Sequence, residues 1–339
     1  MSTQLEVTIP LPPAPPDWPE FSWRPMRRDD VAAVFSLLLA VDKADDRDSA
    51  GTLPDAQREF DDPWCNPETD SLLALAANGH VVAFVRTFLN PQPEDEHRCW
   101  LWFESHPDHR RPGLEEALLN WAEARARQRL AAADSALPKR MRYGLQDNLV
   151  SRIALLERRG YSAVRYFYRM RRDLREPIPD RPLPDGIALR TYEPALSRPA
   201  LDAFNEAFRD HWSFEPISPD DWQMFFLQRS TFRPDLTYLA MEDDQVAGLS
   251  FNAISPEENA RSGIHEGWVA ELAVRRPWRK RGIATALLCE TMRAFKAEGL
   301  RYATLGVDTQ NPTGALGLYE RLGFKPVRRF VQLEKRAEA

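Results

Sequence analysis

Cysteine is scarce in this 339-residue sequence, which holds three widely scattered residues, Cys65, Cys99 and Cys289. They form neither a pairable disulfide framework nor a metal-like cluster, so we expect reduced thiols and no metal. No stretch reaches the roughly 18 uninterrupted apolar residues of a membrane span, and the N-terminus lacks the basic start and apolar run of a signal peptide. These absences predict a cytoplasmic protein with no membrane partner.

Positive charge is also in short supply. The formal net charge is −6 at pH 7, with 28% charged and 43% hydrophobic residues. This balance is that of an ordinary globular protein and disfavours nucleic acid as a partner. The length favours about two domains, each with a sizeable core.

The familiar phosphate-binding signatures are missing as well. No G-x-x-x-x-G-K-S/T segment and no G-x-G-x-x-G segment follows a strand. Their absence excludes a Walker loop and a dinucleotide-binding fingerprint.

Proline, by contrast, is abundant, with 28 residues that concentrate in two places. The first cluster predicts an extended N-terminal arm over residues 1–20. The second predicts a stiff linker over residues 176–186, because proline fixes its own backbone and biases the preceding residue away from helix. The domain boundary therefore falls near residue 180.

The two halves on either side of this linker repeat one pattern. Three matches occur in the same order at nearly one spacing, which predicts a tandem duplication with domains at 21–175 and 187–339. The matched pairs are Arg24 and Arg190, Gly113 and Gly282, and Asn148 and Asn311, at offsets of 166, 169 and 163 residues.

The second half has readable secondary structure, with a hairpin, a strand leading into a basic turn, a helix that Gly299 ends, and a strand-helix-strand unit. This order predicts an α/β or α+β sheet domain with helices packed on it. The expected ranges are strands at 236–241, 245–254, 267–274, 303–307 and 326–333, and helices from 284 and over 312–322.

The chemistry centres on the basic turn over residues 279–284. A tight turn that opens a helix directs several backbone N–H groups at one point, and the helix dipole adds positive potential there. A pyrophosphate is therefore a natural ligand. Gly282 and Ala284 are small enough to let it approach the backbone, and the neighbouring basic side chains add attraction. The alternative is an ordinary solvated basic loop.

Two motifs of the second half resemble the GNAT superfamily of N-acetyltransferases. Residues 272–274 and 279–284 fit its R/Q-x-x-G-x-G/A acetyl-CoA motif, and Asn311 followed by residues 318–324 fits its second signature. The first half repeats the pattern in weakened form, an arrangement that also resembles the mycothiol synthase type. The resemblance implies two tandem GNAT-like domains, each a mixed, mostly antiparallel twisted sheet flanked by helices.

The resemblance also implies acetyl-CoA as co-substrate and transfer of its acetyl group to a primary amine of a small molecule by direct attack, without an acyl-enzyme. The active site would lie in the second domain. A non-catalytic acyl-CoA sensor or scaffold is the alternative. The cofactor-binding residues implied are Leu272, Ala273, Val274, Arg279, Lys280, Arg281, Gly282, Ile283, Ala284, Thr285 and Asn311.

Two residues are candidates for proton transfer. An alkyl ammonium must lose a proton before it attacks, and Glu271, on the cofactor strand, is the expected base. Tyr319 occupies the position of the family's general acid, which protonates the departing thiolate. The alternatives are a structural carboxylate paired with an arginine and a core aromatic residue.

The acceptor is not identified by any motif. His211, Trp212 and Phe208 precede the cofactor motifs and are the expected substrate contacts. They belong to an aromatic-rich segment, residues 204–226, which is equally compatible with a hydrophobic core.

The first half has lost the same chemistry. The offsets place Pro112 and Glu115 in the phosphate turn, which removes a donor and adds negative charge. They also place Trp102 opposite Glu271 and Leu156 opposite Tyr319. The first domain is thus predicted to be degenerate. The chain is then a monomer with an internal pseudo-dimer, with a homodimer as the alternative.

Overall fold

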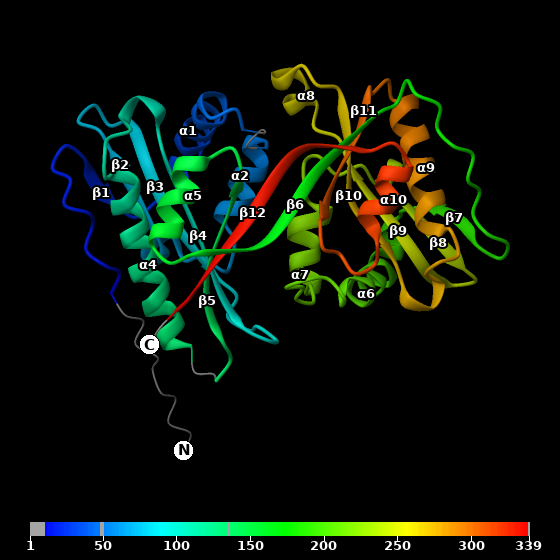
Figure 1. Cartoon of the computed structure of the whole chain (residues 1–339), viewed down its shortest axis with the longest axis horizontal. Helices are drawn as coiled ribbons and strands as arrows, with labels where there is room; N and C mark the ends of the chain where they lie inside the picture. Colours follow the sequence, from blue (N-terminus) through cyan, green and yellow to red (C-terminus); the bar gives the residue numbers. More distant parts are fainter. Residues whose placement is uncertain (1–10, 48–50, 134–135, 338–339) are drawn as a thin grey trace. The chain divides into compact units, whose positions relative to one another are not determined.

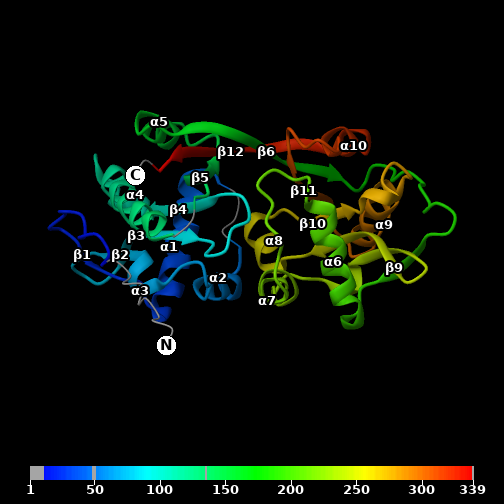
Figure 2. The same cartoon turned by 90° about the horizontal axis from the view of Figure 1, so that it is seen from below.

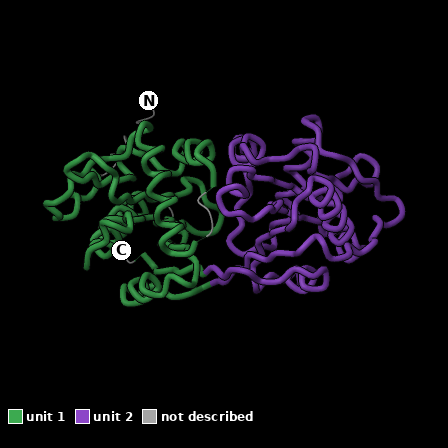
Figure 3. The backbone as a smooth tube through the Cα atoms, turned by 90° about the horizontal axis from the view of Figure 1, so that it is seen from above, with its two compact units in different colours: residues 1–164, 331–339 green, residues 165–330 purple. Residues whose placement is uncertain are grey.

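A computed structural model describes residues 11–47, 51–133 and 136–337. The first ten residues of the predicted N-terminal arm lie outside this part of the chain. In its remainder, the Trp121 indole N–H donates to the carbonyl of Pro13 at 3.1 Å. The chain forms two compact units, residues 1–164 with 331–339 and residues 165–330, which Figure 3 colours separately. We call them unit 1 and unit 2.

Unit 1 is a sheet in the order β1-β2-β3-β4-β5-β12 with helices on it. The pairs from β1 to β4 are antiparallel, and β4–β5 is parallel. The strands are β1 Ser22–Arg24, β2 Ser71–Leu75, β3 Val81–Leu89, β4 His97–Ser105, β5 Lys139–Gln146 and the end of β12 Lys325–Arg336, and the helices are α1 Val31–Ala44, α2 Leu53–Phe60, α3 Pro67–Asp70, α4 Leu114–Ala132 and α5 Val150–Arg158, with short 3₁₀ turns at Arg28–Asp30 and Pro107–His109 (Figure 1).

Unit 2 repeats this arrangement in the order β6-β11-β10-β9-β8-β7. Its one parallel pair among these strands is β10–β11, and the others are antiparallel. The strands are β6 Ser162–Asp173, β7 Ala188–Thr191, β8 Tyr238–Glu242, β9 Gln245–Ala253, β10 Glu266–Val274 and β11 Tyr302–Asp308, and the helices are α6 Ser197–Phe208, α7 Pro219–Trp222, α8 Pro256–Ser262, α9 Ile283–Ala297 and α10 Ala315–Arg321, with a π-helical turn at Gln223–Leu227 and 3₁₀ turns at Pro194–Leu196, Pro234–Leu236 and Arg276–Trp278. The predicted fold class is confirmed.

Alternation along β8 explains how helices cover both faces of the unit 2 sheet. Leu239 and Met241 join the core beneath α6, whereas Tyr238 and Ala240 join the core beneath α9. Successive strand residues point to opposite faces, so a continuous apolar run is buried on both sides.

Helix α9 is bounded by two glycines with left-handed backbone. Gly282 precedes it with φ +89°, and Gly299 follows it with φ +78°. Between them, Leu287, Leu288 and Phe295 are fully buried. The structure thus confirms the expected helix and its end at Gly299. Glycine is favoured at both ends because other residues adopt left-handed backbone reluctantly.

The compact units do not coincide with the expected domains 21–175 and 187–339. Strand β6 ends the first repeat in sequence, yet its residues from Arg165 onwards belong to unit 2. Residues 167–173 of β6 pair with β11, and Figure 2 labels both strands. Strand β12 ends the second repeat, yet its last residues lie in unit 1, where Glu334 meets Arg142 at 2.8 Å. A sequence repeat indicates only the order of the strands along the chain. It does not indicate which of two similar strand edges the last strand of each repeat joins.

The proline-rich segment 176–186 has irregular backbone that packs on unit 2. Ile178 and Leu183 contact its core, and the carbonyl of Pro179 accepts from Arg293 at 3.1 Å. The segment is therefore held along the domain that follows it.

Among the described residues, no helix is long and apolar enough to cross a membrane, and no three His, Cys, Asp or Glu side chains gather so as to hold a metal ion. The three cysteines are buried free thiols.

Candidate active site

The candidate active site lies in unit 2, where β10 and β11 diverge. The two parallel strands pair from Glu266 with Tyr302 to Val269 with Leu305, and β10 then continues to Val274 paired with β9 but no longer with β11. Divergence leaves backbone groups of β10 without a partner on β11, and two cavities open at this point.

The larger cavity, of about 560 Å³, follows the predicted cofactor motif. We call it the cofactor cleft. It is lined by the predicted residues Leu272, Ala273, Val274, Arg279, Lys280, Gly282, Ile283, Ala284 and Thr285.

The smaller cavity, of about 310 Å³, is lined by Glu271 and Asp308 and by several aromatic side chains, among them Phe167, Tyr168 and Trp268. We call it the acceptor cavity. It shares Phe208, His211, Leu272, Ala315 and Tyr319 with the cofactor cleft, so the two cavities meet at these side chains.

The turn before α9 has the geometry of an anion cradle. Lys280 and Gly282 both have left-handed backbone, with φ of +64° and +89°. A Cβ added at Gly282 would meet nothing within 4 Å, so the backbone here faces open space. Backbone N–H groups at the start of a 15-residue helix, bordering an open cleft, fit a pyrophosphate.

The arginines of the motif are engaged with the protein itself. The Arg279 guanidinium donates to the Asp210 carboxylate at 2.7 Å and to the carbonyls of Ala207 and Val274 at 2.8 and 3.1 Å. Arg281 pairs with Glu242 at 3.0 Å. Arg279 thus ties the end of α6 to the turn, and Arg281 is not among the lining residues. Attraction of a phosphate falls mainly to the backbone and to Lys280.

A β-bulge marks the position of Glu271. The register between β10 and β9 shifts between Val269 and Glu271, whereas the corresponding β3–β4 pair of unit 1 runs without a shift from Ala83 with Ser105 to Leu89 with Cys99. Bulges next to functional sites redirect a side chain. Here the bulge brings the Glu271 carboxylate into the acceptor cavity.

The surroundings of Glu271 favour its neutral form. Burial raises the pKa of Glu271 to about 8, and the Arg229 charge opposes this only weakly. Among the described residues the carboxylate has no hydrogen bond or ion pair, so the alternative of an arginine-paired structural carboxylate has no support. A carboxyl group with a pKa near neutrality is suited to accept and release a proton.

Tyr319 lies where the two cavities meet. It is 7% exposed, on α10, and its ring stands 6.0 Å from that of Phe324. Burial raises the pKa of Tyr319, and the nearby Glu271 raises it further, so the hydroxyl keeps its proton. Tyr319 therefore belongs to the hydrophobic core and also lines both cavities, so its position is compatible with a core aromatic residue and with a general acid.

The predicted acceptor contacts are only partly brought together. Phe208 and His211 line both cavities, with ring centroids 4.2 Å apart, and burial lowers the pKa of His211. Trp212 lines neither cavity and lies against Phe167 at 6.3 Å. Asn311 lines the acceptor cavity, 3.4 Å from His211, and not the cofactor cleft. Its predicted role at the cofactor stays a prediction.

Sequence reasoning missed one whole wall of the acceptor cavity. Phe167, Tyr168 and Arg169 of β6 line it, together with Trp268 of β10. The Arg169 guanidinium lies 4.4 Å from the Trp268 ring centroid. The available signal is the run of three aromatic residues flanked by arginines at residues 165–169 of β6, but β6 belongs to the other repeat in sequence.

Comparison with known proteins establishes the family. The model of the acetyltransferase (GNAT) family matches residues 38–161 and 199–324, once in each repeat and over well more than half of the chain. The chain belongs to the GNAT family. It is therefore an acyltransferase by class, and acetyl-CoA is the co-substrate that this family uses.

Curated relatives of this GNAT chain carry the name mycothiol acetyltransferase. The protein from Salinispora tropica is 32% identical over 76% of this chain and 78% of its own length. That from Acidothermus cellulolyticus is 32% identical over 55% and 59%. The chain thus spans less than two thirds of the length of some of these relatives.

Solved structures share the tandem GNAT fold. A GCN5-related N-acetyltransferase from Sphaerobacter thermophilus is 26% identical with a TM-score of 0.72, over 96% of this chain and 98% of that one. A tandem GNAT protein from the clavulanic acid biosynthesis pathway is 16% identical with a TM-score of 0.69, over 94% and 99%. The latter likeness concerns the fold alone.

Proposed function

We propose that this GNAT protein transfers an acetyl group from acetyl-CoA to a primary amine of a small molecule, by direct attack within a ternary complex in unit 2. The observation that carries the proposal is the meeting of the two cavities at Tyr319, with Glu271 in the acceptor cavity. Two substrates bound in adjoining cavities are held in reaction geometry without a covalent enzyme intermediate.

Each side chain has a defined task in this proposal. Acetyl-CoA supplies the acetyl group as a thioester. Glu271 takes a proton from the acceptor ammonium, directly or through water, so that the amine nitrogen can attack. As the C–S bond breaks, the Tyr319 hydroxyl, which its raised pKa keeps protonated, donates its proton to the departing sulfur. The second proton that the nitrogen loses on becoming an amide restores that hydroxyl.

The name of the relatives directs the choice of acceptor. Because they are called mycothiol acetyltransferases, a compound of the mycothiol class that carries a free amine is the first acceptor to test. The aromatic walls of the acceptor cavity and its Arg169 are compatible with a larger substrate than a simple alkyl amine. The cytoplasmic location and the oligomeric state stay predictions.

Release of free thiol from acetyl-CoA, measured with a panel of amines, separates catalysis from the alternative of an acyl-CoA sensor or scaffold. The proposal expects thiol release that depends on an amine and yields its N-acetyl product. A protein that binds acetyl-CoA yet releases no thiol with any amine of the panel is the sensor.

A further inference from the structure

The two units can be compared residue by residue within segments that keep one offset of the sequence repeat. In unit 1 the parallel pair β4–β5 begins with His97 opposite Lys139, and in unit 2 the pair β10–β11 begins with Glu266 opposite Tyr302. The offsets are those of the sequence repeat, 169 and 163 residues. The pairs therefore diverge at equivalent points in the two units.

Three alanines that line the cofactor cleft of unit 2 have charged counterparts in unit 1. Ala273, Ala284 and Ala315 come from β10, α9 and α10. At the same offsets unit 1 has a triad from β4, α4 and α5, namely Glu104, Glu115 and Arg152.

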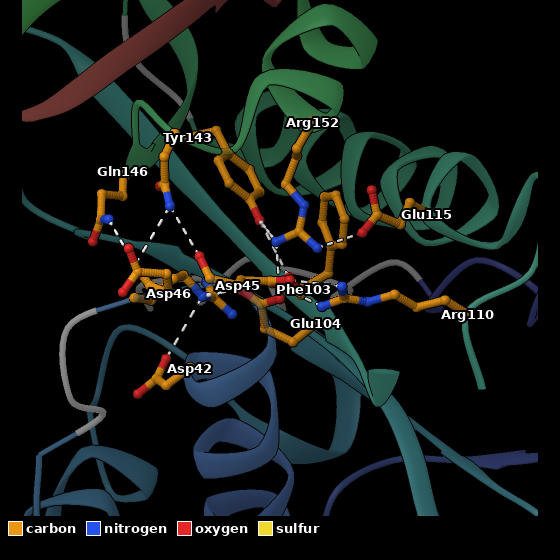
Figure 4. A network of polar contacts seen from close by, with 12 residues as sticks. Asp42, Asp45, Asp46, Phe103, Glu104, Arg110, Glu115, Tyr143, Gln146 and Arg152 are labelled. Carbon is orange, nitrogen blue, oxygen red and sulfur yellow. Dashed lines mark hydrogen bonds and ion pairs between the residues drawn. The ribbon is translucent and has the colours of Figure 1, made fainter. Parts of the chain in front are cut away.

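These three charged side chains contact one another (Figure 4). Arg152 donates to Glu104 at 2.8 Å and to Glu115 at 2.5 Å. The side chains of Arg152 and Glu104 are 5% and 2% exposed, whereas that of Glu115 is 30% exposed. The triad therefore spans from the strand to both helices, across the region that forms an open cleft in unit 2.

Neighbouring residues close the same region further. Tyr143 of β5 is the counterpart of Gly306, which lines the acceptor cavity. Its hydroxyl donates a hydrogen bond to the carbonyl of Phe103 on β4 at 3.2 Å, and this bond links the two strands where they diverge. Arg47 adds a second cation to Glu104 at 2.7 Å. Burial raises the pKa of Glu104, but the Arg152 and Arg47 charges outweigh it and hold that pKa below its usual value. The carboxylate is thus ionised and paired.

We propose that the triad of Glu104, Glu115 and Arg152 is a built-in filling of the first repeat's cofactor cleft: it occupies the space that acetyl-CoA takes in unit 2 and joins β4, α4 and α5 in place of a ligand. The proposal rests on the function assigned to unit 2. The chain then binds one acetyl-CoA, and unit 1 is closed without any ligand. Buried charges that are fully paired hold one arrangement, because loss of any member leaves an uncompensated charge.

Hydrogen–deuterium exchange of the full chain with and without acetyl-CoA tests the first part. We expect exchange to slow by about tenfold or more in peptides of residues 272–285 and to stay unchanged in residues 103–116. Slowing in both segments would overturn the filled cleft of unit 1 and leave the function of unit 2 intact. No slowing in either segment would instead overturn the proposed function.

Removal of the central cation tests the second part. Arg152→Ala leaves Glu115 without its partner and Glu104 with Arg47 alone, so exchange should accelerate in residues 103–116 and 139–156 and stay unchanged in residues 272–285. The matched control is Arg158→Ala, an exposed arginine on the same helix, which should change neither segment. Glu115→Gln keeps the shape and should accelerate exchange to a smaller degree, which covers the case of an unfolded Arg152→Ala chain. Unchanged exchange in folded Arg152→Ala or in Glu115→Gln contradicts the proposal.

Discussion

In the proposed mechanism, Glu271 and Tyr319 serve the same acetyl transfer, one by accepting a proton and the other by donating one. The carboxylate lies in the acceptor cavity and the hydroxyl lies where both cavities meet. Burial acts on both in the same direction, raising each pKa and so favouring the protonated form. In the proposed mechanism the protonated form of Tyr319 is the one that donates, whereas protonation of Glu271 limits its role as the base near neutral pH.

Tyr319→Phe should lower turnover by about 10²-fold while the affinity for acetyl-CoA holds, since the ring keeps its packing and only the donated proton is lost. Steady-state kinetics and calorimetry measure the two quantities. The matched control is Tyr302→Phe on β11, whose ring lines neither cavity and which should leave both unchanged. Full turnover in Tyr319→Phe would reduce the residue to a core aromatic.

Glu271→Gln should remove a limb of the pH–rate profile. With a pKa of about 8, the proton-accepting carboxylate forms as pH rises through that value, so wild-type turnover should rise there. The variant should be most impaired near pH 8 and partly recover at more alkaline pH, where more of the amine is free. Glu320→Gln, an exposed glutamate on α10, is the control. An undiminished profile in Glu271→Gln would assign the proton to another group.

The same pKa makes a statement about stability. A carboxyl group whose pKa is raised by folding stabilises the protein below its unfolded pKa, and this contribution is lost as pH rises through the folded value. Wild-type melting temperature should therefore fall relative to that of Glu271→Gln between about pH 4.5 and pH 8. A difference in melting temperature that does not change with pH would contradict a raised pKa.

Residue identities at this site were predictable because short motifs carry them. Gly282, Ala284 and Tyr319, which the two motifs select, line the cofactor cleft, and their roles stay predictions. The motifs did not indicate that Arg279 bonds Asp210 and two carbonyls, because a side chain's partner depends on elements distant in sequence.

At the scale of elements, strands β10 and β6 supply a large part of the lining of the acceptor cavity. Strand β10 presents Glu271 through its bulge, and β6 supplies Phe167, Tyr168 and Arg169. Strand ranges and α9 followed from hydrophobic periodicity and from glycine positions. The pairing of β6 with β11 of the other repeat could not be predicted in this way. Both repeats offer β6 a similar strand edge, and local sequence does not choose between them.

Arg169→Met should raise the KM for the acceptor several-fold and leave the KM for acetyl-CoA unchanged. The guanidinium lines the acceptor cavity over Trp268 and is absent from the cofactor cleft. Arg175→Met, at an exposed arginine after the same strand, should change neither constant. A rise in both constants would show that β6 acts on the fold and not on the acceptor.

At the scale of the whole molecule, one chain holds two copies of a fold and one candidate active site. The duplication was evident from sequence, because three matched segments recur at nearly one offset. Loss of function in the first copy stays a prediction, which rests on Pro112, Glu115, Trp102 and Leu156. The contact between Glu104 and Arg152 could not be predicted, since neither residue belongs to a motif.

The central claim is that unit 2 alone binds acetyl-CoA and transfers its acetyl group. Gly282→Glu and Gly113→Glu form a matched pair, because both glycines precede an equivalent helix and have similar backbone, with φ of +89° and +83°. Each variant therefore carries a similar conformational strain. Only Gly282 faces the cofactor cleft.

Calorimetric titration of acetyl-CoA into the wild type and these two variants is the most direct measurement. We expect one equivalent bound by the wild type and by Gly113→Glu, and none by Gly282→Glu, because bulk and negative charge then stand in the phosphate cradle. Two equivalents in the wild type, or one retained by Gly282→Glu, would contradict the central claim.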